Sequence, residues 1–515
     1  MQSRHAVCGF APLLLMASLS TPAATFTVTR ADDPLMATCT PLDCSLRAAV
    51  AASAITPAAD LILLPEGVYT VARSALTVSG GLTIRGVGPT LTSIVGTSED
   101  VKIFGGALVD LTIEGLRFTT GAEEAIGVDD GRLVLRDVDM PNAANVVIVR
   151  QGALTASLTV QGSTLGTAGC IGIAPLCTFV DSRVTSLAMI GEQIELDVRR
   201  VQFAGDGSSA GIYFNSNGRA RIADATFSNH SRPIEVNAPD VDVLVERSLF
   251  IGNVGPMRGS GSGTIRLDDV EFRDNIVSNS NSGLPAVLSA TDGVAWRINR
   301  ALFDGNRGGA SAVSIGAVIA ADNGANVVIT NSTFVDNTYR SGASPINSHA
   351  IGVRTTTADP TIMWLFHVTM RRPTTVPATT LGSLLAVSGT GGSVRLFNTA
   401  LDGTCKFLSG GSVLQAVGSI ESIGNSCGIA GAGNLVNVPA AQLGLGTLAD
   451  HGGYTHTFLP AAGSVLVGAA SPTWCPFTFG IDQRRYVRPA GWIGCDVGAV
   501  EAGSISDVLF ADGFE

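Results

Sequence analysis

The chain has 515 residues, of which 61 are glycine and only 15% are charged, and its formal net charge is −11. Its only lysines are Lys102 and Lys406, so it has no basic stripe, which argues against a nucleic-acid partner. This composition, with little sign of amphipathic helix, suits one elongated all-β chain rather than several globular domains.

The first 24 residues have the features of a secretory signal. The basic pair Arg4-His5 precedes an apolar stretch, and Pro22–Ala24 offers a small-residue cleavage site. That stretch is shorter than a membrane-spanning helix requires, and no later segment qualifies. Cleavage would remove Cys8 and leave eight cysteines in an exported chain, where disulfides are expected.

One eight-residue frame recurs twelve times between Leu111 and Leu401. Its order is apolar, any, apolar, any, corner, any, any, apolar. The last position, which we call the anchor, is filled by Phe118, Met140, Leu165, Val184, Phe203, Phe227, Phe250, Phe272, Phe303, Phe334, Met370 and Leu401. Successive frames are 19 to 36 residues apart, so the motif is constant while the connections vary. Stacked coils with loops on one side produce this pattern.

The frame predicts a bend in each coil. Alternation in its first half places two side chains on one face of a short strand, and the apolar pattern then slips by one residue at the corner. A straight strand could not keep both apolar sets inside after that slip, whereas a chain that bends there can. The frame therefore predicts an all-β, single-stranded parallel β-helix (a solenoid) of about 12 or more coils with capped ends. At ~4.8 Å per coil, its twelve frames would form a rod about 58 Å long.

Two polar rows follow the coils. The corner position is occupied from the fourth anchor onward by Asp181, Arg200, Asp224, Arg247, Asp269, Arg300, Asn331, His367 and Asn398. Opposite charges one coil apart attract, so this row predicts a structural charge ladder along the bend, with a catalytic or ligand groove as the alternative. The row three residues after the anchor includes Asn253, Asn275, Asn306 and Asn337, which favours a ladder of asparagine turns.

The eight cysteines fall into local pairs. Many connectivities are compatible with eight cysteines, so pairing by proximity is a hypothesis. It joins Cys39 to Cys44, Cys170 to Cys177, Cys405 to Cys427 and Cys475 to Cys495. None of these pairs has metal-site spacing with histidine, so no zinc site is expected.

Short motifs near the N terminus resemble those of a known family. Cys44-Ser45-Leu46-Arg47 resembles the CSLREA motif of secreted bacterial β-helix proteins, although Ala48 replaces the family's glutamate. The segments 59–71 and 82–90 are similar to the entry strands of pectin-lyase-like right-handed β-helices.

The C-terminal stretch resembles the choice-of-anchor Q domain that closes many such proteins. The matching residues are His451-Gly452-Gly453, Thr455, Asp482-Gln483-Arg484, Arg488-Pro489, Cys495–Ala499 and Glu501. The family's glycine after the Asp-Gln-Arg run is Arg485 here. The resemblance implies a right-handed β-helix that is secreted or attached to a cell surface. It implies no reaction, because the fold hosts lyases, hydrolases and adhesive rods alike.

These features suggest a division of the chain. It comprises a signal peptide at 1–24, an N-terminal cap with the CSLR motif at 25–60, the parallel β-helix at 61–420, a choice-of-anchor Q-like cap at 421–501 and a short tail at 502–515.

Glycoside hydrolysis needs two carboxylates, and the corner row offers Asp181, Asp224 and Asp269. Members two coils apart would be separated by ~9.6 Å, near the upper limit for an inverting pair. The arginines between them would keep both acids ionised, which argues against a general acid in this row. The chain also has no Asn-Thr-Asp, Gly-His-Gly or Arg-Ile-Lys signature.

Lyase chemistry needs a basic residue and a cation that neutralises a uronate. The densest acidic group, with arginines interleaved, supplies the catalytic candidates Asp268, Asp269, Glu271, Arg273 and Asp274. Calcium is the cation that such a group could hold. A solvated corner of the coil is the simpler interpretation.

Long connections between Phe272 and Leu401 add residues to consecutive coils. Such insertions build a wall on one side of a solenoid, and such faces often bind partners. The polar candidates for binding there are Arg307, Asp322, Asp336, Arg340, His349, Arg354 and Asp359.

The sequence thus favours a secreted or cell-surface scaffold for adhesion, or for binding an extracellular glycan or a surface protein. We expect a monomer and no cofactor; calcium would accompany only the lyase alternative. The alternative is a polysaccharide lyase or glycoside hydrolase that acts on extracellular polysaccharide. A self-associating surface-layer rod would need an uncapped coil edge and ranks last.

Overall fold

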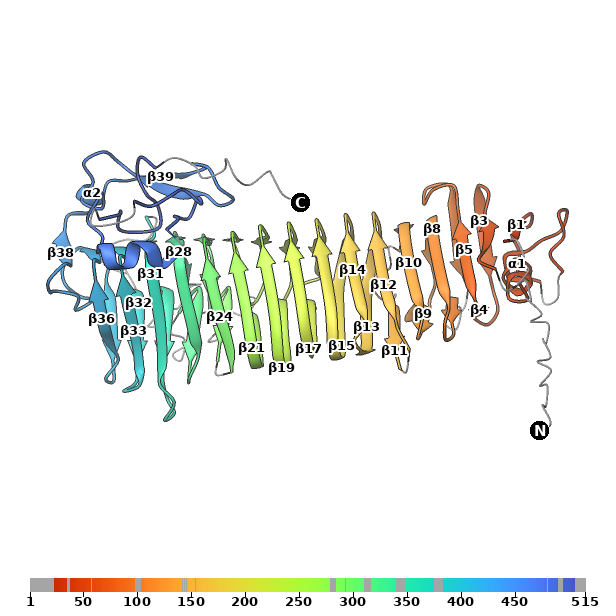
Figure 1. The fold of residues 1–515 in the computed structure, drawn as a ribbon, viewed down its shortest axis with the longest axis horizontal. Helices are drawn as coiled ribbons and strands as arrows, with labels where there is room; N and C mark the ends of the chain where they lie inside the picture. Colours follow the sequence, from red (N-terminus) through yellow and green to blue (C-terminus); the bar gives the residue numbers. More distant parts are fainter. Residues whose placement is uncertain are drawn as a thin grey trace, which may run out of the picture.

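The computed structural model describes residues 23–504 except 35–37, 57, 98–102, 141, 143, 145, 153, 278–283, 292, 310–315, 340–347, 375–382, 479 and 490–493. Most of the predicted signal peptide and tail, and Arg340, therefore lie outside the described residues. The described chain is an elongated stack of parallel strands that advances steadily from one end to the other (Figure 1). It confirms the parallel β-helix.

Three ladders of parallel strands form the stack. The first carries the start of each frame and runs through β1 (Thr25–Thr27), β2 (Asp60–Leu63), β5 (Gly81–Arg85), β8 (Asp110–Thr119), β10 (Arg132–Asp139), β12 (Ser157–Gln161), β14 (Leu176–Val180), β15 (Arg183–Arg199), β17 (Ala210–Ala223), β19 (Arg232–Glu246), β21 (Met257–Asp268), β24 (Val294–Asn299), β28 (Asn326–Val335), β31 (Thr361–Arg371), β33 (Gly392–Phe397) and β36 (Ser412–Val417).

The second ladder carries the anchors. Besides parts of longer strands it contains β3 (Gly67–Val71), β6 (Thr92–Gly96), β13 (Thr164–Ile173), β16 (Gln202–Ala204), β18 (Thr226–Ser228), β20 (Leu249–Ile251), β22 (Glu271–Arg273), β25 (Leu302–Asp304), β34 (Ala400–Asp402), β37 (Ile420–Ser422) and β38 (Leu435–Val438).

The third ladder closes each coil. It is built from β4 (Leu76–Val78), β7 (Ile103–Gly105), β9 (Glu124–Asp129), β11 (Val146–Gln151), the first halves of the long strands, β23 (Leu288–Ala290), β27 (Ile319–Asp322), β30 (Ser348–Arg354), β32 (Ser383–Ser388) and β35 (Cys405–Leu408). A small separate pair joins β26 (Arg307–Gly308) to β29 (Thr338–Tyr339).

The register of the ladders confirms the frame. Six anchor phenylalanines from Phe203 to Phe334 are buried and stack as one column, with neighbouring ring centroids 4.2 to 5.0 Å apart. Each stacked pair adds roughly 0.5–1.5 kcal/mol to the burial of its apolar area. The column therefore fixes both the core and the alignment of successive coils.

The corner residues adopt the left-handed backbone conformation. From Asp181 to Asn398 their φ angles lie between 45° and 56°. A residue in this conformation turns the chain sharply, which is the physical reason for the slip in the apolar pattern. The predicted ion pairs also form, with Arg200 on Asp181 at 2.6 Å and Arg247 on Asp224 at 2.9 Å.

The asparagine row forms a buried hydrogen-bond ladder. The Asn253 amide donates to Oδ1 of Asn275 at 2.9 Å, and Asn275 donates to Asn306 at 2.8 Å. Each side chain also donates to the backbone carbonyl of an anchor phenylalanine, as Asn275 does to Phe250 at 2.9 Å. The row is a structural ladder, as predicted, but the left-handed turn residue precedes each asparagine, as Asp274 precedes Asn275.

The N-terminal end of the stack is occupied by α1 (Leu46–Ser53) (Figure 1). Ser45 caps this helix by accepting a hydrogen bond from the backbone of Ala48 at 3.2 Å. Arg47 holds Asp33 at 2.6 Å, which ties the helix to the preceding loop. The four local cysteine pairs are disulfides, as predicted: Cys39–Cys44, Cys170–Cys177, Cys405–Cys427 and Cys475–Cys495.

After β38 the chain leaves the stack and forms what we call the C-terminal unit, residues 439–504. It contains α2 (Ala440–Leu443), the antiparallel pair β39 (Leu445–Ala449) and β40 (Thr457–Pro460), and the 3₁₀ helix η2 (Pro472–Thr478). This unit lies along the flank of the last coils (Figure 1). Among the described residues no helix is long and apolar enough to cross a membrane.

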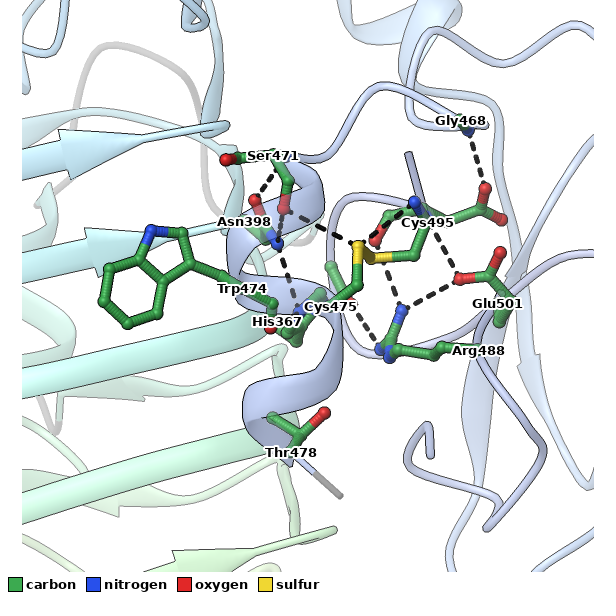
Figure 2. Close-up of a disulfide and its surroundings, with 12 residues drawn as sticks. His367, Asn398, Gly468, Ser471, Trp474, Cys475, Thr478, Arg488, Cys495 and Glu501 are labelled. Atoms are coloured by element: carbon green, nitrogen blue, oxygen red, sulfur yellow. Dashed lines mark hydrogen bonds and ion pairs between the residues drawn. A yellow bond between two sulfur atoms is a disulfide. The ribbon is translucent and has the colours of Figure 1, made fainter. Parts of the chain in front are cut away.

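The C-terminal unit docks on the corner row. Around the Cys475–Cys495 disulfide, Asn398 donates to the carbonyl of Ser471 at 3.2 Å, and the fully buried Arg488 pairs with Glu501 at 3.1 Å (Figure 2). Arg488 also donates to Oδ1 of Asn331 at 3.2 Å, which fixes the unit against a coil 157 residues earlier in the chain.

Candidate functional site

The catalytic candidate Asp269 lies at the junction between the β-helix and the C-terminal unit. It is only 2% exposed and accepts a hydrogen bond from Arg300 at 2.7 Å and another from Arg485. Burial would raise the pKa of Asp269, but the two arginines outweigh it and the pKa lies below its ordinary value. The group stays ionised, which suits an ion pair better than proton transfer.

The other catalytic candidates also contact protein or solvent rather than a shared cavity. Burial raises the pKa of Asp268, which lies 3.8 Å from Arg300. Arg273 binds Nδ1 of His456 in the C-terminal unit at 2.7 Å. Asp274 is exposed and has a left-handed backbone. No group of three or more potential metal ligands occurs among the described side chains.

The structure brings together only two of the binding candidates in the long-loop coils. Asp322 and Arg354 form an ion pair at 2.8 Å. Asp336 instead accepts a hydrogen bond from the backbone of Thr374, at 3.1 Å.

The remaining loop candidates lie apart from that ion pair. His349 is buried and its ring centroid is 5.9 Å from that of Tyr339; burial lowers the pKa of His349. Arg307 and Asp359 are exposed. The described residues therefore give this side of the rod no single constellation of binding groups.

A polar groove lies elsewhere, at the bend between the third and first ladders. It consists of two hollows of about 700 and 470 Å³ that share Ala174. We call it the corner groove, and its lining is Leu108–Asp110, Asp130–Arg132, Thr155–Ser157, Ala174, Leu176, Gln193, Glu195, Asn217–Arg219, Asp240 and Asp242. It crosses successive coils from β8 to β19.

The groove exists because the chain bends here without a protruding loop. Strands β15, β17 and β19 run through the bend, where Ala174, Gln193 and Asp240 have φ angles of 53° to 60°. At Gly218 an added Cβ would come within 2.2 Å of the carbonyl oxygen of Ile194, so only glycine allows the coils to approach this closely.

One row of charged side chains runs through the larger hollow. Glu195, Arg219 and Asp242 are adjacent in register on three successive coils. Asp242 is paired with Arg266 at 2.9 Å. Glu195 and Arg219 are exposed, and neither side chain has a hydrogen bond or ion pair within the described chain. Their polar groups remain available to a ligand.

The eight-residue frame does not reveal these groove residues, because they occupy outward positions at which the frame accepts any residue. The row Asp110, Arg132, Ser157, Leu176, Glu195, Arg219 and Asp242 precedes the first apolar position of each frame. The signal that could have revealed these residues is the polar character of this outward row, in which most members are charged.

No protein-family model and no curated protein matches the chain. Among solved structures, it is similar to the catalytic domain of GH87 α-1,3-glucanase in complex with nigerose (11% identity, TM-score 0.38), covering 64% of this chain and 63% of that one. It is also similar to a mannuronic acid specific polysaccharide family 6 lyase from human gut microbiota (13% identity, TM-score 0.29), covering 76% and 91%. A third is pectate lyase Pel9A (14% identity, TM-score 0.22), covering 94% and 97%.

The names of all three neighbours describe enzymes that act on polysaccharides. The chain spans less than two thirds of the glucanase domain's length. The fold of this chain rests on its own strand pairing, and these neighbours assign it no residue roles.

Proposed function

We propose that this protein is an extracellular β-helix scaffold that binds a polysaccharide along the corner groove. The observation that carries the proposal is the groove itself, in which Glu195 and Arg219 lie exposed and unpaired among amide, hydroxyl and carboxylate groups. The disulfides fit an oxidising compartment. The resemblance of both ends to secreted, surface-attached β-helix proteins supports the same location.

The shape of the groove favours an extended polymer over a compact ligand. A polysaccharide lying along the rod would meet a new set of side chains at each coil, every ~4.8 Å. Individually weak contacts would then add up over successive coils. Carboxylates accept hydrogen bonds from sugar hydroxyls, whereas the guanidinium and amide groups donate them.

The proposal is tested by binding measurements on a panel of neutral and acidic polysaccharides. A double variant with Glu195→Gln and Arg219→Gln removes both unpaired charges and leaves a polar amide at each position. Hydrogen bonds to charged groups contribute about 1.5–3 kcal/mol, so we expect affinity to fall roughly 10- to 100-fold.

The matched control is Arg183→Gln, because Arg183 is exposed and unpaired within the described chain but lies outside the groove. We expect it to bind like the wild type, and both variants to keep the wild-type melting temperature. Unchanged affinity in the double variant would reject the groove as the binding site.

A second candidate function is glycoside hydrolysis by Glu195 and Asp242. These carboxylates lie two coils apart on one row, a separation of ~9.6 Å that is close to that of inverting pairs. Arg219 lies between them in register, and Arg266 forms an ion pair with Asp242 at 2.9 Å, an arrangement that suits ion pairing better than proton transfer.

This second candidate is tested by measuring reducing ends and unsaturated products released from the same panel. Product that disappears in both Glu195→Gln and Asp242→Asn would support hydrolysis at this row. Product that persists in both variants, or no product from the wild type, would exclude it.

A further inference from the structure

Another hollow, of about 400 Å³, lies next to the corner groove. Both are bounded by β19, which contributes Asp240 and Asp242 to the groove and Asn237 to this hollow. We call it the Arg258 hollow, since the guanidinium of Arg258 is its only cation among the described lining residues. A polymer in the groove could therefore reach both.

Arg258 has no counterion within the described chain. Its nearest carboxylate in register, Glu235 on the preceding coil, is already paired with Arg232 at 3.1 Å. Nε of Arg258 is buried and has no hydrogen-bond partner there. A guanidinium without partners favours a ligand group that accepts hydrogen bonds from it.

The rest of the lining comprises Glu235, whose carboxylate is paired with Arg232 outside the hollow lining, apolar Val236 and Leu284, and several neutral polar side chains. Ser260 donates to Oδ1 of Asn237 at 2.8 Å, which leaves the NH₂ group of that amide to donate elsewhere. Ser289 and Thr291 add hydroxyl groups to the lining. The hollow thus combines one unpaired cation with several hydrogen-bonding groups suited to sugar hydroxyls.

We infer that the Arg258 hollow binds the carboxylate of an acidic sugar in the bound polysaccharide. The planar guanidinium can donate two parallel hydrogen bonds to a carboxylate, which makes the contact both strong and specific. The protein's net charge of −11 repels acidic polymers at long range, so their recognition needs a local unpaired cation. This inference rests on the proposed function and adds the class of sugar.

The experiment compares binding of the wild-type chain to alginate and polygalacturonate with binding to their carboxyl-reduced forms. Carboxyl reduction replaces each uronate by the corresponding neutral sugar and keeps the linkage. We expect the wild type to prefer the acidic form of at least one polymer by about tenfold, which corresponds to ~1.4 kcal/mol.

Three variants locate the preference. Arg258→Gln should abolish it without changing affinity for the reduced polymer, and Arg258→Lys should keep part of it because the charge remains while the paired donors are lost. Arg183→Gln, which lies outside the hollow, should keep all of it. Circular dichroism and melting temperature establish that each variant is folded.

The outcomes separate the inference from the proposed function. Equal affinity of the wild type for the acidic and reduced forms overturns the inference and leaves polysaccharide binding intact. Retention of the acid preference in Arg258→Gln overturns it as well. Failure of the wild type to bind any polysaccharide rejects the proposed function and the inference together.

Discussion

Replacing Asp269 by alanine distinguishes a structural role of the corner row from a catalytic one. The substitution removes the carboxylate that Arg300 and Arg485 share. The Arg300 side chain is 9% exposed and would remain as a buried charge, whereas Arg485 is 41% exposed and can turn to solvent. The loss of stability should therefore come mainly from Arg300.

The expected magnitude follows from this burial. Breaking a buried pair by removing one partner costs about 3–5 kcal/mol. Asp268, at 3.8 Å from Arg300, would compensate in part, so we expect a loss near the lower end, about 3 kcal/mol. The matched control is Asp181→Ala, because Asp181 and Arg200 form the same bidentate pair on the same row but are about half exposed. It should scarcely change stability.

The assay is urea denaturation followed by circular dichroism, combined with limited proteolysis of the C-terminal unit. Asp269→Ala should unfold at lower urea and release fragments from residues 439–504 faster than Asp181→Ala does. Polysaccharide binding in the corner groove should be unchanged wherever the variant is folded. Equal stability of the two variants would refute the burial argument. Lost product formation at unchanged stability would instead establish Asp269 as catalytic.

Two further variants test the interior. Asn275→Ala leaves the buried amide of Asn253 and the hydrogen-bond-accepting carbonyl of Phe250 without their partner, so it should lower the free energy of unfolding in urea by about 3 kcal/mol. The control Asn215→Ala, at an exposed position, should scarcely change this free energy. Similar losses in the two variants would contradict a structural role of the asparagine ladder. Burial raises the pKa of Glu501 from 4.5 to about 7. Between these two values the folded protein keeps a proton on Glu501 that the unfolded chain has lost. The free energy of unfolding should therefore fall as the pH rises from about 4.5 to about 7. Melting curves across this range should show a smaller fall in Glu501→Gln, and parallel curves would contradict the expectation.

Much of the fold could be predicted because the interior imposes a period on the sequence. Each coil must bury its apolar side chains against its neighbours, so Phe203 and Phe227 recur at matching frame positions. The corner was predictable for the same reason, since the slip in the apolar pattern requires a turn of the backbone there. Ladders of charged or amide residues then follow from the stacking of equivalent positions.

The groove could not be predicted in this way because no comparable constraint acts on outward positions. Glu195, Arg219 and Asp242 become neighbours only once the register of three coils is known. The docking of the C-terminal unit was equally hidden, because Asp269 and Arg485 are 216 residues apart. Asp269, one of the catalytic candidates suggested by their acidic surroundings, is a hydrogen-bond partner of that unit.

The corner row nevertheless carries a signal for the docking site. Its charged pairs give way after Arg300 to Asn331, His367 and Asn398, all fully buried. These are the positions that the C-terminal unit covers, with His367 bound to the carbonyl of Trp474 at 3.2 Å and Asn331 to Arg488 at 3.2 Å. Burying further charges would cost more than burying amide and imidazole groups that find partners. The covered stretch also includes the buried pair of Asp269 and Arg300, whose charges offset each other, so the change from charged to neutral corners falls within the docking site. The exposed corner pairs before it, such as Asp181 and Arg200, remain on the solvent-facing part of the rod.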